Sequence, residues 1–403
     1  MKRIAVVVQR CHRDVAGGSE ALAWHYAQLL QAQAAVEILT SCALDYRSWD
    51  NALPAGSEEC DGITLRRFPS AWPRGSWFGE LHRRLLQAHT VHVEQRGETE
   101  IPWRAQLAEQ FVRAQGPWCP GLLDHLQAHQ ADYDAVLFCT YLYPTTYFAL
   151  ECVPAHKRVL IPTLHDEPPA YLAIYARAAQ RAARIVWLTD AERRLGQRLW
   201  QVDRGDVVGM AVPVQAATAA ARELPYLLYC GRIDESKGCR ELIAAFRELR
   251  ARRRGAVELV LTGADHLDLR TGDGVHFLGF VAEAEKRSLM AGAKAFVMPS
   301  RWESFSIVTL EALAQGTPVV VNGDCDVLAD HVAEAAAGWS YRGTEELQRC
   351  LAAALDLPAP QRAQMGERAR RYVTGRFGRE AVTARLHAAV ALEHPTTSAP
   401  QSC

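Results

Sequence analysis

The sequence lacks any strong excess of charge of one sign. Its 403 residues carry 45 Lys and Arg against 46 Asp and Glu, for a formal net charge of −1. A protein that binds duplex nucleic acid concentrates positive charge on one domain or face, because contacts to the phosphate backbone dominate its affinity. We therefore expect no nucleic-acid partner.

Long apolar runs and paired cysteines are also missing. The longest apolar run near the start is Ile4–Val8. It is far shorter than the roughly 18 residues of a membrane-spanning helix, and it is also shorter than the apolar core of a signal peptide. The eleven cysteines are an odd number and include no C-x-x-C pair, which excludes a regular disulfide framework or zinc site. Together these absences predict a reduced, cytoplasmic protein.

What the sequence does contain is an alternation of short β-branched runs with amphipathic stretches. Such an alternation is typical of an α/β fold with parallel sheets. Strands are predicted in two series, at 4–8, 36–40, 135–139, 158–162 and 184–188, and then at 226–230, 257–263, 275–280, 295–299 and 318–322.

The two series predict two Rossmann-like domains. The first spans residues 1–205 and contains an insertion at about 68–130, where Trp and Pro-Gly breaks interrupt the rhythm. The second spans 206–375, and a helix at 376–390 is expected to pack back on the first domain. The tail at 391–403 lacks periodicity and is expected to be disordered.

The most specific string follows the predicted strand 226–230. Gly231, Arg232, Lys237 and Gly238 form a strand-to-helix turn before the helix predicted at 239–251. Ligands of open parallel sheets bind at the carboxyl ends of strands, and helix amino termini favour anions. Arg232 and Lys237 are therefore placed for a phosphate group, although a solvated loop with two surface cations explains the string equally well.

A second string follows the strand at 295–299. Glu303 falls in a loop and Glu311, eight positions later, falls in the helix that the loop opens. The backbone amides and hydroxyls between them form a second positive helix end, contributed by Ser304, Phe305, Ser306 and Ile307. An alternative is that Glu303 or Ser304 simply caps this helix.

Together, these two strings and the following Gly316-Thr317-Pro318-Val319 resemble the retaining glycosyltransferases of family 4, also called group 1. The resemblance is specific over about 226–322 and weaker over 1–205. It implies the GT-B architecture, with two facing Rossmann-like domains and a cleft between them. The nucleotide-sugar donor would be held mostly by the second domain.

The resemblance also implies roles for single residues. Arg232 and Lys237 match positions that neutralise the donor diphosphate, beside Gly231 in the turn. Glu303 matches the first glutamate of the E-x7-E motif, at the donor sugar, and Glu311 the second, at the ribose. Fixed cations and helix ends would stabilise the charge that grows on the departing diphosphate.

Such a site can dispense with a metal, and we expect no cofactor besides the nucleotide-sugar co-substrate. The sequence spells D-x-D at 132–134 and at 324–326, a metal-binding pattern of the other major transferase fold. The first lies at the amino end of a strand, the wrong end for a ligand cleft. We expect a metal role for neither.

In the first domain, Gly17 and Gly18 resemble the family's glycine loop, which faces the diphosphate and the acceptor. They do not form a G-x-G-x-x-G fingerprint, and a glycine pair also reads as a plain turn. His165 resembles the family histidine near the donor sugar, although a lone histidine is more often structural. The segment 322–326 departs from the Gly-Gly pair that many relatives carry after this strand.

The resemblance implies transfer of a sugar, with retention, to a glycan or lipid-linked acceptor, in cell-envelope polysaccharide or glycoconjugate synthesis. The acceptor is expected on the first domain, where the insertion supplies aromatic side chains for stacking or for the core, namely Trp72, Trp77, Phe78 and Trp103. Six arginines within 177–198 do not form one stripe, so we expect at most weak peripheral contact with the inner face of a membrane.

Two other classes share these features. A non-catalytic module that only binds nucleotide-sugars would keep the same motifs, although the intact glutamates and cations argue against it. A sugar-nucleotide epimerase would share the architecture but would need a catalytic base of its own, for which the sequence has no signature.

Overall fold

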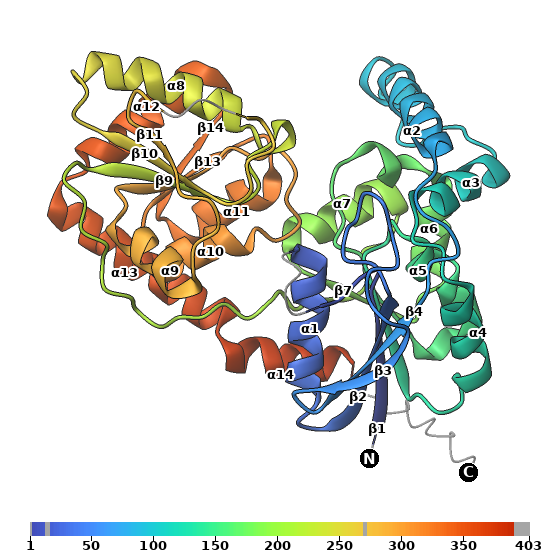
Figure 1. The fold of residues 1–403 in the computed structure, drawn as a ribbon. Helices are drawn as coiled ribbons and strands as arrows, with labels where there is room; N and C mark the ends of the chain where they lie inside the picture. Colours follow the sequence, from blue (N-terminus) through green and yellow to red (C-terminus); the bar gives the residue numbers. More distant parts are fainter. Residues whose placement is uncertain (1, 13–16, 269–271, 391–403) are drawn as a thin grey trace, which may run out of the picture. The chain divides into compact units, whose positions relative to one another are not determined.

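A computed structural model describes residues 2–12, 17–268 and 272–390, so the tail predicted at 391–403 lies outside the described residues. The chain divides into two compact units (Figure 1). Unit 1 comprises Met1–Leu188, Arg193–Val208 and the residues from Thr383 onward, and unit 2 comprises Thr189–Glu192 and Gly209–Val382. The last described residues, from Thr383, are thus assigned to the same unit as the first ones.

Unit 1 is built on an eight-stranded sheet with the order β3-β4-β2-β1-β5-β6-β7-β8. β3 pairs antiparallel with β4, and the other pairings are parallel. The strands are β1 Lys2–Val7, β2 Ala34–Ser41, β3 Gly56–Cys60, β4 Ile63–Phe68, β5 Ala135–Cys139, β6 Arg158–Ile161, β7 Arg184–Trp187 and β8 Asp206–Val207.

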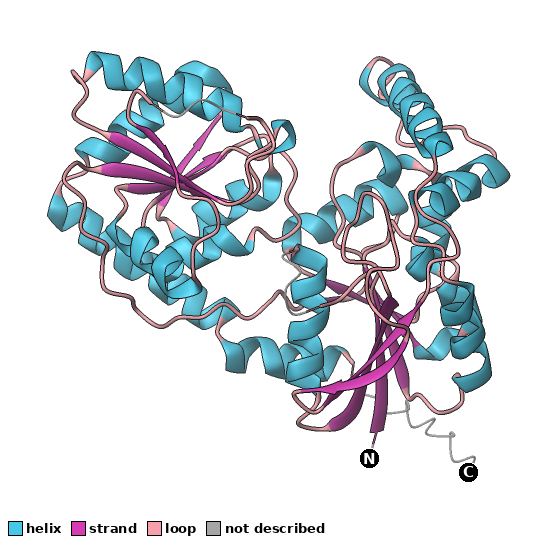
Figure 2. Cartoon of the chain, in the orientation of Figure 1, coloured by secondary structure: helices cyan, strands magenta, loops and turns pink. Residues whose placement is uncertain are grey.

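Helices cover both faces of this sheet (Figures 1 and 2). On one face, α1 (Gly18–Leu30) lies beside α14 (Arg379–Ala389), where the His387 ring contacts the Leu29 carbonyl at 3.1 Å. The other face carries a hydrophobic core. Its helices include α2 Ser76–His89, α3 Ala105–Gln115, α4 Pro120–His129, α5 Pro144–Tyr147 and α6 Ala173–Gln180, and α7 Asp190–Trp200 follows β7.

Unit 2 is built on a six-stranded parallel sheet with the order β11-β10-β9-β12-β13-β14. Its central strands are apolar along their whole length and buried on both faces, as expected for a sheet covered on both sides by helices. The strands are β9 Tyr226–Cys230, β10 Glu258–Thr262, β11 Val275–Phe277, β12 Ala295–Met298, β13 Val319–Asn322 and β14 Gly338–Tyr341.

The helices of unit 2 form a layer on each face of the sheet. Figure 1 shows α8 and α12 together on one face, and α9, α10 and α13 on the other. The helices are α8 Cys239–Arg252, α9 Glu283–Gly292, α10 Ile307–Ala314, α11 Asp326–Ala335, α12 Gly343–Asp356 and α13 Ala359–Phe377.

Four strands escape the sequence prediction, and one predicted strand is too long. β3 reads Gly-Ser-Glu-Glu-Cys and is an edge strand without an apolar face, while β4, β8 and β14 are short or alternate. The strand predicted at 275–280 ends at Phe277, two residues before Gly279, whose φ of +67° lies outside the β region.

Each sheet has a switch point at which the strand order reverses. In unit 1 the chain passes from β1 to β2 on one side and later to β5 on the other. In unit 2 it passes from β9 to β10 on one side and later to β12 on the other. Ligands of open α/β sheets bind beyond the carboxyl ends of the strands at such points, so a ligand of unit 2 is expected beside the turns after β9 and β12.

None of the helices within the described ranges combines the length and the apolar character needed to cross a bilayer.

Candidate functional site

The turns after β9 and β12 bring two predicted site residues into direct contact. The Lys237 ammonium donates to Glu303 Oε1 at 2.6 Å. The two side chains are 21% and 14% exposed, so the pair is shielded but reachable from solvent. Residues 66 positions apart in sequence thus form one charged centre at the switch point of unit 2.

Lys237 is held by the local geometry of its turn. The Asp234 carboxylate accepts the Lys237 backbone N–H at 3.0 Å and caps a short 3-10 turn, Glu235–Lys237. Gly238 then adopts a φ of +70°, and a Cβ at this position would lie 2.7 Å from the Pro299 carbonyl oxygen. Only glycine fits here, because both the backbone angle and the approach to the β12 loop exclude a side chain.

Arg232 is more open than Lys237. Its side chain is 46% exposed and lies 3.4 Å from Asp234 Oδ2, while its carbonyl accepts the Tyr229 hydroxyl at 2.6 Å. Gly231 has a φ of +148° beside the Tyr229 ring. The turn therefore fixes the Arg232 backbone, and the half-exposed guanidinium can be reached by an anion from solvent.

A buried histidine, His331, anchors the loop between Glu303 and α10. His331 Nε2 lies 2.9 Å from the Phe305 carbonyl, and Nδ1 lies 2.8 Å from the Tyr372 hydroxyl. A carbonyl only accepts, so Nε2 carries the proton and Nδ1 accepts from Tyr372. Burial lowers the pKa of His331 to about 4, and the neutral ring serves as a structural strut for the loop.

The other predicted loop residues are largely turned into unit 2. Ser304 and Phe305 are buried, and the Phe305 ring packs against Phe377 with ring centroids 5.3 Å apart. Ser306 adopts a φ of +56°, and its hydroxyl lies 2.9 Å from the Thr309 hydroxyl. Ile307 begins α10. Their side chains hold the loop, so any contact with a ligand from Ser304–Ser306 would come from the backbone.

Glu311 forms a second shielded ion pair, and its partner lies outside both sequence strings. Lys286 Nζ lies 2.9 Å from Glu311 Oε2 and 3.2 Å from Oε1. Burial raises the pKa of Glu311, and the nearby Lys286 partly offsets the effect. Lys286 lies on α9, so this pair joins two helices on one face of the sheet.

In unit 1, the predicted glycine loop is locked by Glu20. The Glu20 carboxylate is buried and accepts from Arg10 Nε, from Ser19 Oγ at 3.0 Å and from Gln9 at 3.3 Å. A Cβ at Gly17 would lie 2.1 Å from Glu20 Oε2, whereas nothing lies within 4 Å of a Cβ at Gly18. Gly17 is thus required by packing, and Gly18 borders open space.

His165 lies beyond the carboxyl end of β6, next to a carboxylate. Its Nδ1 is 3.6 Å from Glu167 Oε1, and Glu167 also accepts the Tyr141 hydroxyl at 2.8 Å. Burial opposes ionisation of Glu167, but the contacts with His165 and Tyr141 outweigh it and lower the pKa of this carboxyl group. His165 is therefore part of a hydrogen-bonded cluster in unit 1.

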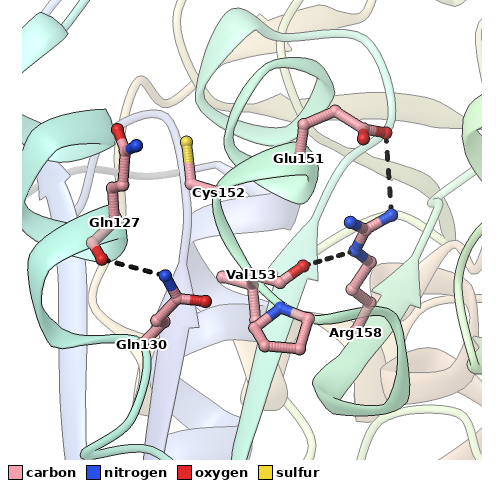
Figure 3. A pocket seen from close by; sticks show the side chains of 7 residues that line it. Gln127, Gln130, Glu151, Cys152, Val153 and Arg158 are labelled. Atoms are coloured by element: carbon pink, nitrogen blue, oxygen red, sulfur yellow. Dashed lines mark hydrogen bonds and ion pairs between the residues drawn. The ribbon is translucent and has the colours of Figure 1, made fainter.

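A cavity of about 330 Å³ opens at the other end of the unit 1 sheet (Figure 3). It lies before the amino end of β6 and is lined by Gln127, Gln130 and the segment 151–154. Arg158 closes one side, where its guanidinium donates to the Val153 carbonyl at 2.7 Å and lies 3.6 Å from Glu151. None of the predicted site residues contributes to this cavity.

The aromatic residues of the 68–130 segment divide into two kinds. Trp103 and Phe78 pack against the core of unit 1, whereas Trp72 and Trp77 are exposed. Trp72 stacks on Trp118 with ring centroids 6.0 Å apart. The arginines of the 177–198 segment form ion pairs with different partners. Arg198, for example, pairs with Asp166.

Neither D-x-D string is arranged as a metal site. Asp134 accepts the Arg3 backbone N–H at 2.7 Å, and Asp324 lies 3.3 Å from Arg342. Across the ranges that the structure describes, no three His, Cys, Asp or Glu side chains gather in a way that would hold an ion.

Comparison with known proteins follows the division into units. The family model described as "Glycosyl transferases group 1" matches residues 215–372, which lie in unit 2. A phosphatidyl-myo-inositol mannosyltransferase of Mycolicibacterium smegmatis is 33% identical over 158 residues, covering 35% of this chain and 41% of the relative. The D-inositol 3-phosphate glycosyltransferase of Frankia alni is 27% identical over 71% of this chain and 74% of its own length.

Other curated relatives are matched over only 25–32% of their length. Among solved structures, Anabaena HepE in complex with UDP and glucose superposes with a TM-score of 0.65 and 16% identity, over 96% of this chain and 99% of HepE. Sucrose-phosphate synthase from Thermosynechococcus elongatus gives a TM-score of 0.65 and 19% identity, with 96% and 98% covered. The fold is GT-B, and residues 215–372 match the group 1 glycosyl transferase model.

Proposed function

We propose that the protein transfers a sugar from a nucleoside-diphosphate-sugar to a glycan or lipid-linked acceptor, with retention of anomeric configuration. The observation that carries the proposal is the Lys237–Glu303 pair at the switch point of unit 2. Two motifs that were recognised separately in the sequence meet there, in a unit of group 1 glycosyltransferase type.

Lys237 and Arg232 are the proposed diphosphate ligands. Both follow β9, and the amino end of α10 adds backbone N–H groups at the neighbouring strand. As the bond between the anomeric carbon and the diphosphate breaks, negative charge grows on the leaving oxygen. Fixed cations stabilise this charge more in the transition state than in the ground state, which is the condition for catalysis.

Glu303 is the proposed ligand of the donor sugar, and its pairing with Lys237 sets the position of both. When a diphosphate takes the place of the carboxylate at Lys237, Glu303 becomes free to accept sugar hydroxyls. The acceptor oxygen then forms its bond to the anomeric carbon on the face that the diphosphate leaves. The acceptor proton passes to a diphosphate oxygen, so no protein carboxylate acts as a nucleophile.

Further proposals concern the cofactor, the acceptor and the product. These charged side chains supply the stabilisation without a metal, so we propose that the reaction needs no cofactor. We further propose that unit 1 binds the acceptor, that Gly17, Gly18 and His165 contribute to donor binding, and that the biological product is a cell-envelope glycan or glycoconjugate. The names of the mannosyltransferase and glycosyltransferase relatives support the transfer of hexoses.

A donor screen tests the proposal. The purified protein is incubated with UDP-, GDP- and ADP-hexoses, and release of nucleoside diphosphate is followed with and without candidate acceptors. We expect turnover with one donor class, and an NMR spectrum of the product that retains the donor's anomeric configuration. Binding without hydrolysis or transfer would favour a non-catalytic module, and interconversion of the donor sugar would favour an epimerase.

Membrane contact is tested separately. We propose only weak, peripheral association, because no basic stripe lines up in the 177–198 segment and Trp72 and Trp77 are the main exposed aromatic residues of the insertion. Flotation with anionic vesicles is expected to carry a small fraction of the protein, and complete absence from the vesicle fraction would contradict this part of the proposal.

A further inference from the structure

A second ion pair of unit 2 joins Lys286 to Glu311. Lys286 belongs to neither of the two sequence strings that carry the family resemblance. Lys286 lies 25 positions before Glu311 and on a different helix, α9. Its ammonium contacts both carboxylate oxygens of Glu311, at 2.9 and 3.2 Å. It also contacts Glu283 at 2.9 Å.

The two carboxylates that share Lys286 differ strongly in exposure. Glu311 is 12% exposed and Glu283 is 73% exposed, whereas Lys286 is 15% exposed. An exposed pair adds little, since water screens it. The shielded contact with Glu311 is the one in which the lysine charge matters, because a buried carboxylate without a partner takes up a proton instead of remaining ionised.

The pair lies in the same unit as the proposed diphosphate ligands, on the helices that precede and follow β12. The charges of Lys286, Glu311 and Glu283 all act on the thiol of Cys230, the last residue of β9. Cys230 directly precedes Gly231 and Arg232. Glu311 is therefore near the diphosphate turn and within the same unit.

The remaining charged groups around Glu311 do not replace Lys286. Arg287, also on α9, lowers its pKa less than Lys286 does, and Glu283 raises it. From α13, Arg370 donates to the Gln315 carbonyl just after the far end of α10. The adjacent strands β12 and β13 carry no charged side chain.

We propose that Lys286 is a positioning residue of the donor site, which keeps the Glu311 carboxylate ionised and oriented to accept the ribose hydroxyls of a nucleoside diphosphate. The inference rests on the proposed function, because it assigns Glu311 to the ribose. An ionised carboxylate can accept from both hydroxyls of a ribose diol, whereas a protonated one loses acceptor capacity. Lys286 therefore acts through Glu311 and not on the reacting atoms.

The test compares Lys286→Met with Lys286→Arg and with a matched control, Lys294→Met. Lys294 lies just after α9 in the same unit, and among the described residues its ammonium has no carboxylate partner. Binding of UDP, GDP and ADP is measured by calorimetry at several pH values between about 6 and 8. Thermal unfolding of each variant checks that it is folded.

We expect Lys286→Met to weaken binding of the preferred diphosphate at least about tenfold, as loss of a charged contact does. The ratio of its dissociation constant to that of the wild type should grow as the pH falls, because the pKa of Glu311 rises further without the lysine. Titration of the ligand phosphate cancels in this ratio. Lys286→Arg should restore binding, since arginine stays charged, and Lys294→Met should bind like the wild type.

Two further readouts separate positioning from a general packing role. The wild type should prefer the ribo-nucleotide to its 2′-deoxy analogue, and Lys286→Met should lose this preference. Adding Lys286→Met to Glu311→Gln should cost no further affinity. Wild-type affinity in Lys286→Met, a pH-independent ratio, or additive losses in the double variant would overturn the inference. Failure of the wild type to bind any of the three diphosphates would instead overturn the proposed function.

Discussion

The strand-to-helix turn after β1 in unit 1 and the turns after β9 and β12 in unit 2 use their charges differently. After β1, Glu20 is buried and is saturated by neighbours within eleven positions in sequence, Arg10 among them. After β9 and β12, Lys237 and Glu303 meet from loops 66 positions apart and remain partly exposed. The first arrangement fixes a backbone, whereas the second leaves two charged groups that a ligand can reach.

The difference in exposure between the two sets of charged groups indicates where a ligand can bind. A buried carboxylate whose partners are all supplied locally belongs to the fold, because removing a partner costs stability. A reachable pair can exchange one partner for a ligand of the same charge. The difference is consistent with the donor chemistry proposed for unit 2, and it gives Glu20 a framework role.

The largest expected effect is the loss of transfer in Lys237→Met and in Glu303→Gln. Each should lower kcat by about 10²–10³-fold, the range seen when one stabilising group of a transition state is removed. Thermal unfolding of both variants separates lost chemistry from lost stability, because each change removes one partner of a shielded ion pair. Wild-type turnover in both variants would show that the reachable pair is not the reactive one, and Lys294→Met serves as the control.

A second prediction concerns His331, which supports the loop after Glu303. His331→Leu should lower the free energy of unfolding at neutral pH by about 1–3 kcal/mol, because the Phe305 carbonyl and the Tyr372 hydroxyl lose their partner. Denaturant unfolding measures the change. A conservative His331→Gln variant, which retains one donor, is expected to lose less.

The same histidine predicts a pH dependence. Burial lowers its pKa to about 4 in the folded protein, whereas an unfolded chain titrates near about 6.5. Between these values the unfolded state binds the extra proton, so stability is complete above about pH 6.5 and falls as the pH drops toward 4. His331→Leu should flatten this part of the stability curve, and an unchanged slope would contradict the structural role.

A smaller effect is expected from the two glycines after β1. Gly17→Ala should destabilise the protein by about 1–3 kcal/mol, since its methyl group would overlap the Glu20 carboxylate. Gly18→Ala borders open space and should unfold like the wild type. Melting temperatures of the two variants, measured by thermal shift, test this prediction. Equal melting temperatures would show that Gly17 is not more constrained than Gly18.

The smallest effect is expected from metal removal. The proposed site relies on Lys237, Arg232 and backbone N–H groups for charge stabilisation, so EDTA should leave the rate of donor turnover unchanged. A loss of activity that added Mg²⁺ or Mn²⁺ restores would show that the reachable cations of unit 2 are not sufficient.

Much of this arrangement was predictable from the sequence, because it depends on local patterns. The apolar runs that became β9, β12 and β13 are buried on both faces, and such runs stand out in any window. Lys237 and Glu303 were found because each lies at a fixed distance from its strand.

The remaining features depend on contacts between distant segments. β3 has no apolar face because it is an exposed edge, so no pattern marks it. The meeting of Lys237 with Glu303 requires β9 and β12 to be neighbours, which is a matter of strand order. Lys286 and His331 reach their partners from other helices, and a sequence window around Glu303 or Glu311 contains no sign of either.

Equilibrium binding of nucleoside diphosphates to the wild type and to Lys237→Met tests the central claim most directly. Calorimetry with UDP, GDP and ADP is expected to show one site for at least one of them, with affinity reduced at least about tenfold in Lys237→Met and unchanged in Lys294→Met. Equal affinity of the wild type and Lys237→Met for every diphosphate would contradict a donor site at the Lys237–Glu303 pair.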